Sequence, residues 1–247
     1  MENALLIGLS RQMTLRRDME VHANNMANIN TPGYKRGTLL FEEFLMPVAR
    51  MSDASGQDAR ISFVLDTSIY RDFAAGAFEQ TGNELDVAIE GDGWFVVQTP
   101  DGERYTRNGQ LKLDAAGQLV TPAGLPVLGT GGPIVLPLNE TSLEIAKDGT
   151  ISTNQGVRGQ LRIVRFQDNA ALKKQAGQLF STTQAPEPAL EAKVHQGMVE
   201  KSNVEPVVEM TQMIETMRAY QSVTRAIQNT DELRREAIGR LGGAREA

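Results

Sequence analysis

Two long helical patterns, one at each end of the chain, constrain the fold more than any other feature. Apolar residues recur every three or four positions over residues 3–28 and again from residue 202 to about Ile238. At 1.5 Å per residue, these helices would be about 40 Å and about 50 Å long. The second is much longer than a typical helix of a globular domain, which favours a coiled coil or a helical assembly.

The residues at the inner ends of both patterns predict where the helices stop and start. The run Asn24-Asn25-Met26-Ala27-Asn28-Ile29-Asn30-Thr31-Pro32-Gly33 ends the first helix, because Asn tolerates the left-handed conformation and Pro cannot continue a helix. Ser202 to Glu205 has the form of a capping box, and Pro206 is tolerated in a first helical turn. Gly239 and the pair Gly242-Gly243 would end the second helix.

The middle of the chain has a different character. Turn signals such as Thr99-Pro100-Asp101-Gly102 and Asp114-Ala115-Ala116-Gly117 separate short apolar runs such as residues 94–97 and 161–166. This pattern predicts a meander of β-hairpins. The segment 34–79 is predicted to connect the helix to the β-domain. It would include a short helix with Phe41, Phe44 and Leu45, followed by a polar loop over residues 48–60. The sequence therefore predicts an α+β chain with an N-terminal helix (1–33), a connecting segment (34–79), an all-β domain (80–201) and a C-terminal helix (202–247).

Each terminal helix has an apolar stripe that needs a partner. We expect the two helices to pair with each other as an antiparallel coiled coil, because the chain leaves one and enters the other through the same domain. Two helices make a thin core, so their outer faces should meet other copies or other subunits. Methionine suits surfaces that pack in several environments, although it is equally common as core filler. The predicted assembly interface consists of Leu5, Leu9, Met13, Met19, Asn24, Asn25, Met26, Asn28, Met210, Met213, Ile214, Met217, Tyr220 and Ile227.

The asparagines in this set have two interpretations that the sequence leaves open. Asn24, Asn25 and Asn28 would either form hydrogen bonds across subunits or only cap the helix and shape the turn.

Composition excludes several classes of function. The chain has no cysteine, which rules out disulfides and thiolate chemistry. Its net charge of −6 argues against binding to nucleic acid or anionic lipid. No apolar run is long enough to span a bilayer, and the stretch Ala4–Leu9 lacks the basic lead of a cleaved signal.

No motif indicates catalysis, a metal or a cofactor. His22 and His195 belong to no ligand pattern, and no serine lies in a nucleophile elbow. The glycine clusters at 91–93 and 129–132 lack the features of a phosphate loop and are read as turns. We therefore expect a protein that is not an enzyme and has no catalytic, cofactor-binding or metal site.

Three motifs resemble the signatures of the bacterial flagellar rod and hook family. The run Ala23 to Arg36, with its Asn-Asn-apolar-Ala-Asn pattern, is similar to the segment that closes that family's first helix. The stretch Thr81 to Phe95, continuing through Asp101–Gly109 and Gly117–Val120, resembles the start of its β-domain. Ser202-Asn203-Val204, followed by Met213-Ile214-Glu215 and Arg218-Ala219-Tyr220, is similar to its closing signature. These motifs occur in the family's order and cover nearly the whole chain.

The resemblance implies a structural subunit of the flagellar basal body that is exported by the flagellar type III apparatus without a cleaved signal. It implies that the terminal helices form an inner tube in the periplasmic rod, that the β-domain forms an outer layer, and that the rod carries torque to the hook. Its partners would be copies of itself, proximal and distal rod subunits and, in transit, the export apparatus, with no nucleic acid and no direct lipid binding. Within the family, the length and the start Met1-Glu2-Asn3 favour the proximal rod. The alternatives are a distal-rod subunit or a non-flagellar β-domain binding module.

Overall fold

The computed structural model describes residues 2–47, 60–137 and 142–243. The chain divides into two compact units, and it passes between them at four points. The helix unit consists of Met1–Ala27, Gly37–Tyr70 and Glu205–Ala247. The β unit consists of Asn28–Arg36 and Arg71–Val204. Each unit therefore joins segments that are far apart in the sequence.

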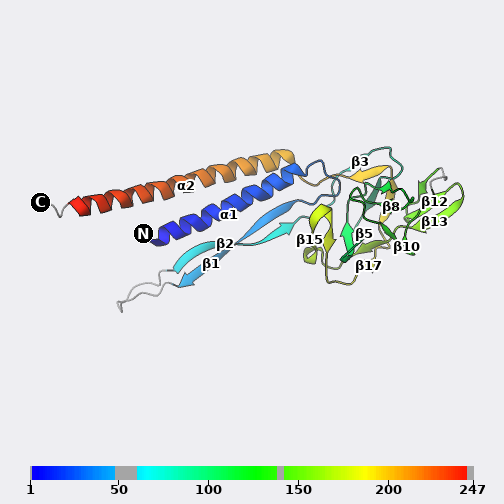
Figure 1. Cartoon of the computed structure of the whole chain (residues 1–247), viewed down its shortest axis with the longest axis horizontal. Coiled ribbons are helices and arrows are strands. Elements are labelled where there is room, and N and C mark those ends of the chain that lie inside the picture. The colour runs from blue at the N-terminus through cyan, green and yellow to red at the C-terminus, as the bar shows by residue number, and fades with distance from the viewer. Residues whose placement is uncertain (1, 48–59, 138–141, 244–247) are drawn as a thin grey trace. The chain divides into compact units, whose positions relative to one another are not determined.

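The helix unit is built on two long helices, as the apolar periodicity predicts. Helix α1 spans Glu2–Ala27 and helix α2 spans Pro206–Gly243. They run side by side in opposite directions, since Gly8 lies against Ile227 near one end and His22 against Glu209 near the other (Figure 1). Neither of these two described helices has the length and apolar character needed to cross a membrane.

A two-stranded sheet completes the helix unit. Strand β1 spans Gly37–Pro47, strand β2 spans Arg60–Arg71, and β1 packs against α1. The predicted short helix at Phe41, Phe44 and Leu45 is wrong, because this stretch belongs to β1. Pairing with β2 supplies the backbone hydrogen bonds of a strand and overrides the local apolar spacing. Most of the loop predicted at 48–60 lies outside the described residues.

Helix α2 begins three residues later than a capping box with Ser202 as its N-cap would place it. Pro206 is its first residue, and the Glu209 amide donates to the carbonyl oxygen of Glu205 at 3.0 Å. Proline suits this first position because its missing N–H would have no partner in the helix. Ser202 instead accepts a hydrogen bond from the Val204 amide, and Asn203 binds the backbone of Arg36 and Asp72. Tertiary hydrogen bonds therefore hold this stretch out of the helix.

The β unit contains short strands joined by turns, most of them where Gly and Asp recur in the sequence. The turn at Pro100-Asp101, for example, joins strand β5 to strand β6, as predicted. Two short 3₁₀ helices occur at Asn169–Ala171 and Ala176–Gln178. The strands are β3 (Phe78–Gln80), β4 (Val87–Glu90), β5 (Trp94–Thr99), β6 (Gly102–Thr106), β7 (Lys112–Leu113), β8 (Leu119–Val120), β9 (Leu128–Gly129), β10 (Gly132–Pro133), β11 (Glu144–Ile145), β12 (Thr150–Thr153), β13 (Gly156–Gln160), β14 (Ile163–Arg165), β15 (Lys173–Lys174), β16 (Phe180–Ser181), β17 (Glu187–Pro188), β18 (Lys193–Gln196) and β19 (Met198–Glu200).

The strands pair in antiparallel fashion. The largest sheet has the order β15-β16-β6-β5-β14-β17, and β11-β12-β13 form a second sheet. The returning strands β18 and β19 pair with β4 and β3, so the stretch that leaves the unit lies beside the stretch that enters it. This long-range pairing closes the unit.

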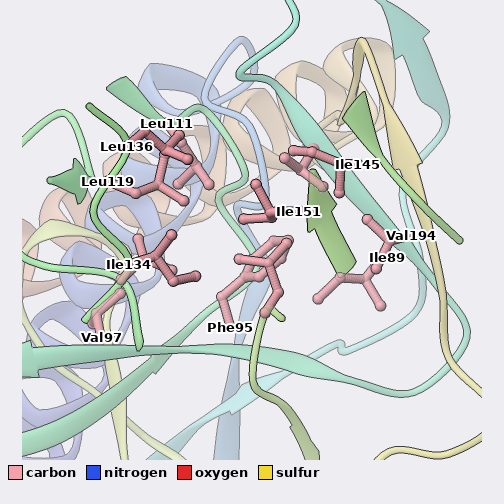
Figure 2. Packing of buried hydrophobic residues seen from close by; sticks show 13 residues of the cluster. Ile89, Phe95, Val97, Leu111, Leu119, Ile134, Leu136, Ile145, Ile151 and Val194 are labelled. Carbon is pink, nitrogen blue, oxygen red and sulfur yellow. The ribbon is translucent and has the colours of Figure 1, made fainter. Parts of the chain in front are cut away.

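Two apolar clusters form the core of the β unit. The larger one includes Val87, Phe95 and Ile151, none more than 1% exposed, and Figure 2 shows it from close by. In the second, Trp94 packs edge-on against Phe180 with ring centroids 5.0 Å apart. These residues come from strands across the whole unit, so it has an apolar interior of its own.

Candidate assembly interface

Polar side chains form hydrogen bonds between α1 and α2. Gln12 Nε2 donates to Tyr220 Oη at 3.2 Å and to Thr224 Oγ1 at 3.0 Å. One turn and a half further along α1, Thr216 Oγ1 donates to Asp18 Oδ2 at 2.9 Å. We call these residues, together with His22 and Glu209, the polar seam. Directional hydrogen bonds of this kind fix one register between two helices, whereas apolar contacts tolerate slippage.

Apolar contact inside the pair is limited. A Cβ added to Gly8 would lie 3.0 Å from Ile227 Cγ1, so the two helices approach closely where α1 has no side chain. Among the side chains that the structure describes, Val21 and Leu39 are the only buried hydrophobic ones in the helix unit. A core this small cannot stabilise two long helices by itself.

His22 is the residue of the polar seam that contacts two carboxylates. Its Nδ1 is 2.6 Å from Glu209 Oε2, and its Nε2 is 3.6 Å from Asp18 Oδ1. The hydrogen bond to Asp18 and the bond to Glu209 raise the pKa of His22, although burial acts in the opposite direction. Burial also acts to raise the pKa of Asp18, but its hydrogen bonds with His22 and Thr216 outweigh this and lower the pKa. When it is protonated, His22 pairs with Asp18 of its own helix and with Glu209 of α2.

The predicted interface residues fall into two groups. Those that are buried or half-buried within the chain are Leu5, Met19, Asn25, Met26, Asn28, Met213, Tyr220 and Ile227. Those that are exposed are Leu9, Met13, Asn24, Met210, Ile214 and Met217. The exposed group also has neighbours that the sequence analysis did not select, Leu6 and Val207. Their three- and four-residue spacing to the selected residues could have identified them.

The asparagine block braces the turn after α1. Asn25 donates to the Gly37 carbonyl oxygen at 2.7 Å and accepts from the Gly37 amide at 3.0 Å. Asn28 Oδ1 accepts from Thr31 Oγ1 and from Gln178 Nε2, each at 3.3 Å. Two of the three asparagines therefore shape the fold of their own chain, and Asn24 is exposed.

A buried charged cluster in the β unit was missed by sequence reasoning. Lys35 Nζ lies 2.6 Å from Glu200 Oε1 and donates to the Ala74 carbonyl oxygen at 2.7 Å. Arg107 donates to the backbone carbonyls of Ile89 and Gly91 and lies 3.5 Å from Glu200 Oε2. Burial lowers the pKa of Lys35, and the charge of Glu200 opposes that effect. Three charged residues far apart in the sequence gave no local signal of their pairing.

The cluster holds together the segments that enter and leave the β unit. The Gly33 amide donates to the Glu200 carbonyl oxygen at 2.7 Å. Gly33 has a φ of +69°, and a Cβ there would lie 2.4 Å from the Arg107 carbonyl carbon. Only glycine fits this position, which explains the Pro32-Gly33 pair at the end of the asparagine block.

Within the described part of the chain, no group of three or more His, Asp or Glu side chains is arranged to hold a metal ion. His195 is paired at 2.7 Å with Glu90, which lowers the pKa of Glu90. Both histidines are therefore engaged with carboxylates.

This chain thus joins two antiparallel helices, which expose apolar residues such as Leu9 and Met217, to a β unit with its own core. Three family models match the chain: "Flagella basal body rod protein" over residues 5–35, "Flagellar hook protein FlgE/F/G D1 domain" over 88–153, and "Flagellar basal body rod FlgEFG protein C-terminal" over 195–240. The chain is 43% identical to the flagellar basal-body rod protein FlgF of Caulobacter vibrioides, an alignment that covers 98% of this chain and 99% of that protein. It is 33% identical to FlgF of Mesorhizobium japonicum over 98% and 99% of the two chains, and 33% identical to FlgG of Buchnera aphidicola from Acyrthosiphon pisum over 87% and 91%.

The chain belongs to the flagellar basal-body rod protein family. It is a structural subunit of the flagellar rod, it is part of the flagellum basal body, and it assembles with other rod components. The resemblance seen in the sequence motifs is thereby confirmed.

Proposed function

We propose that this subunit joins the rod through α1 and α2, whose outer faces pack as a coiled-coil assembly against copies of itself and other rod subunits. One observation carries this proposal: several large apolar side chains on the pair, among them Leu9, Met13 and Met217, are exposed, while polar side chains form the hydrogen bonds between the helices. In a soluble pair of helices, large apolar side chains are expected to be buried between the helices. The exposed apolar residues therefore need partners outside the chain.

The β unit has its own core and would form the outer layer of the rod. The function of the whole subunit would be mechanical: it would pass torque towards the hook and catalyse no reaction. The chain would reach the periplasmic rod through the flagellar export apparatus, unfolded and without a cleaved signal peptide. Its acidic balance supports an absence of nucleic-acid and direct lipid binding.

A position in the proximal rod is supported by the whole-chain similarity to proteins named FlgF. A distal-rod position is the alternative, because FlgG proteins also align over most of the chain. Quantitative mass spectrometry of detergent-extracted basal bodies distinguishes the two. A low ratio of this chain to the hook subunit supports the proximal rod, and a several-fold higher ratio supports the distal rod.

Substitution of single exposed residues tests the role of the helices. Met217→Glu places a charge on the exposed face of α2, and we expect loss of incorporation into basal bodies and loss of motility. The matched control is Leu190→Glu, which changes a leucine that is 93% exposed on the β unit. Normal assembly of the Met217→Glu protein would contradict the proposal, provided that both variants reach the same level in the cell.

Folding of α1 and α2 would accompany assembly. The small core of the pair suggests that both helices are only partly formed in dilute monomer. Far-UV circular dichroism should then show less helix than α1 and α2 together require, with a gain on assembly. Full helix content in dilute monomer would contradict this part of the proposal.

A further inference from the structure

Two exposed apolar patches lie on the helix pair. The α1 patch consists of Leu6, Leu9 and Met13, and the α2 patch consists of Val207, Met210, Ile214 and Met217. Their exposed fractions range from 40% to 76%. Within each patch the spacing is three or four residues, so its members share one helix face.

The patches lie at opposite ends of the pair. Because the helices are antiparallel, Leu9 is next to the part of α2 near Ile227, whereas the α2 patch is opposite the part of α1 near His22 (Figure 1). The centres of the two patches are roughly 14 residues apart along α2, which corresponds to ~20 Å. They are therefore two different surfaces on two different helices.

The segments that carry the patches have opposite charge. Residues 5–17 contain Arg11, Arg16 and Arg17 and no acidic residue. Residues 205–217 contain Glu205, Glu209 and Glu215 and no basic residue. Glu209 is bound to His22 inside the pair, which leaves Glu205 and Glu215 exposed at the surface. The two patches are thus alike in apolar character, and the segments that carry them are complementary to each other in charge, whereas neither segment is complementary to itself. The pair of Arg16 with Glu20 of the same helix, at 3.5 Å, is exposed and leaves the Arg16 guanidinium accessible to a second copy.

We propose that the α1 patch of one copy packs on the α2 patch of a second copy that is displaced by ~20 Å along the helix axis. This inference rests on the proposed function, and it names the contact by which the helices assemble. Since the two surfaces differ, the contact is heterologous. Each added copy leaves one α1 patch and one α2 patch free, so the same contact can repeat along the rod.

The absence of cysteine makes this contact directly measurable, because any cysteine introduced is the only one in the chain. A size-tagged Leu9→Cys protein is mixed with an untagged Ile214→Cys protein at high concentration and oxidised under mild conditions. We expect more of the tagged–untagged product than random pairing would give. The matched control replaces Ile214→Cys with Gln221→Cys, which is exposed on the same face of α2 beyond the patch, and should give a several-fold lower yield.

A charge exchange tests the electrostatic part. Arg16 of the α1 segment lies opposite Glu205 when the two patches are packed antiparallel. Arg16→Glu in the Leu9→Cys protein should therefore reduce the cross-linking yield several-fold, and Glu205→Arg in the Ile214→Cys protein should restore it. Failure of the exchange to restore the yield would contradict the pairing of these two surfaces.

Three further outcomes would overturn the inference. The first is an equal cross-linking yield with Ile214→Cys and with Gln221→Cys. The second is a predominance of product between two tagged Leu9→Cys proteins. The third is that a chain carrying both Leu9→Cys and Ile214→Cys forms only cross-linked pairs of copies and never a longer series. Cross-linking in growing cells then separates this inference from the proposed function. If both variants are absent from purified basal bodies, the proposed function fails. If they are present but joined only to other rod proteins or to no protein, only the contact between two copies fails.

Discussion

The two units of this protein distribute their polar and apolar side chains in opposite ways. In the β unit, apolar residues such as Phe95 and Ile151 fill the interior, and almost every buried hydrophobic residue that the structure describes belongs to it. In the helix unit, a polar seam runs between the helices, Val21 and Leu39 are the only buried hydrophobic side chains among those described, and several large apolar side chains are exposed. The β unit is therefore complete within one chain, whereas the helix unit has a surface that other subunits must complete.

The largest effect that we expect is on the β unit, from Glu200→Gln. This change removes the negative charge between Lys35 and Arg107 and leaves two buried positive charges. Loss of one partner of a buried ion pair costs about 3–5 kcal/mol of unfolding free energy. Urea unfolding followed by the fluorescence of Trp94, the only tryptophan, reports this unit.

The matched control for Glu200→Gln is Lys201→Gln, which changes a pair with Glu79 whose side chains are about half exposed. Exposed pairs contribute about 0–1 kcal/mol. Equal losses for the two variants would mean that the buried cluster does not hold the β unit together.

A second prediction compares the same type of truncation in both units. Ile151→Ala should lower the unfolding free energy by about 2–5 kcal/mol, because it leaves a cavity among fully buried neighbours. Leu9→Ala should leave the stability of the monomer within about 0.5 kcal/mol, because this side chain is already exposed, and it should instead reduce incorporation into basal bodies. A stability loss of similar size in both variants would contradict the division of roles between the units.

The smallest effect is a pH dependence of the helix unit alone. The raised pKa of His22 contributes stability that is complete below its unfolded value of 6.5 and is lost as the pH rises through the folded value. The lowered pKa of Asp18 contributes stability that is present above its unfolded value and is lost as the pH falls through the folded one. Helix content measured by circular dichroism should therefore be highest in mildly acidic solution, below pH 6.5, and should decrease as the pH rises through the raised pKa of His22.

A His22→Gln variant provides the control for this pH dependence. It should lose the decrease at rising pH, while the fluorescence of Trp94 should be the same in both proteins over that range. A decrease that persists in His22→Gln would show that another group is responsible.

How far the sequence predicts this structure depends on the range of the interactions involved. The apolar periodicity correctly predicts both helices, and the recurring Gly and Asp turns predict the β-hairpins, because these signals involve residues close together in the chain. The predicted start of α2 at the capping box was wrong, and so was the short helix predicted where the structure has strand β1. In both cases bonds to distant residues, such as that of Asn203 to Arg36, outweigh the local pattern.

The sequence by itself determined the family, the two long terminal helices and the β-rich segment between them. Only the tertiary structure decided which face of each helix meets the other. Helical periodicity marks an apolar stripe but cannot tell whether that stripe meets a helix of the same chain or a neighbouring subunit. The hydrogen bonds of Gln12, Asp18 and His22 decide it, because they hold the polar faces together in one register and leave the apolar patches on the outside.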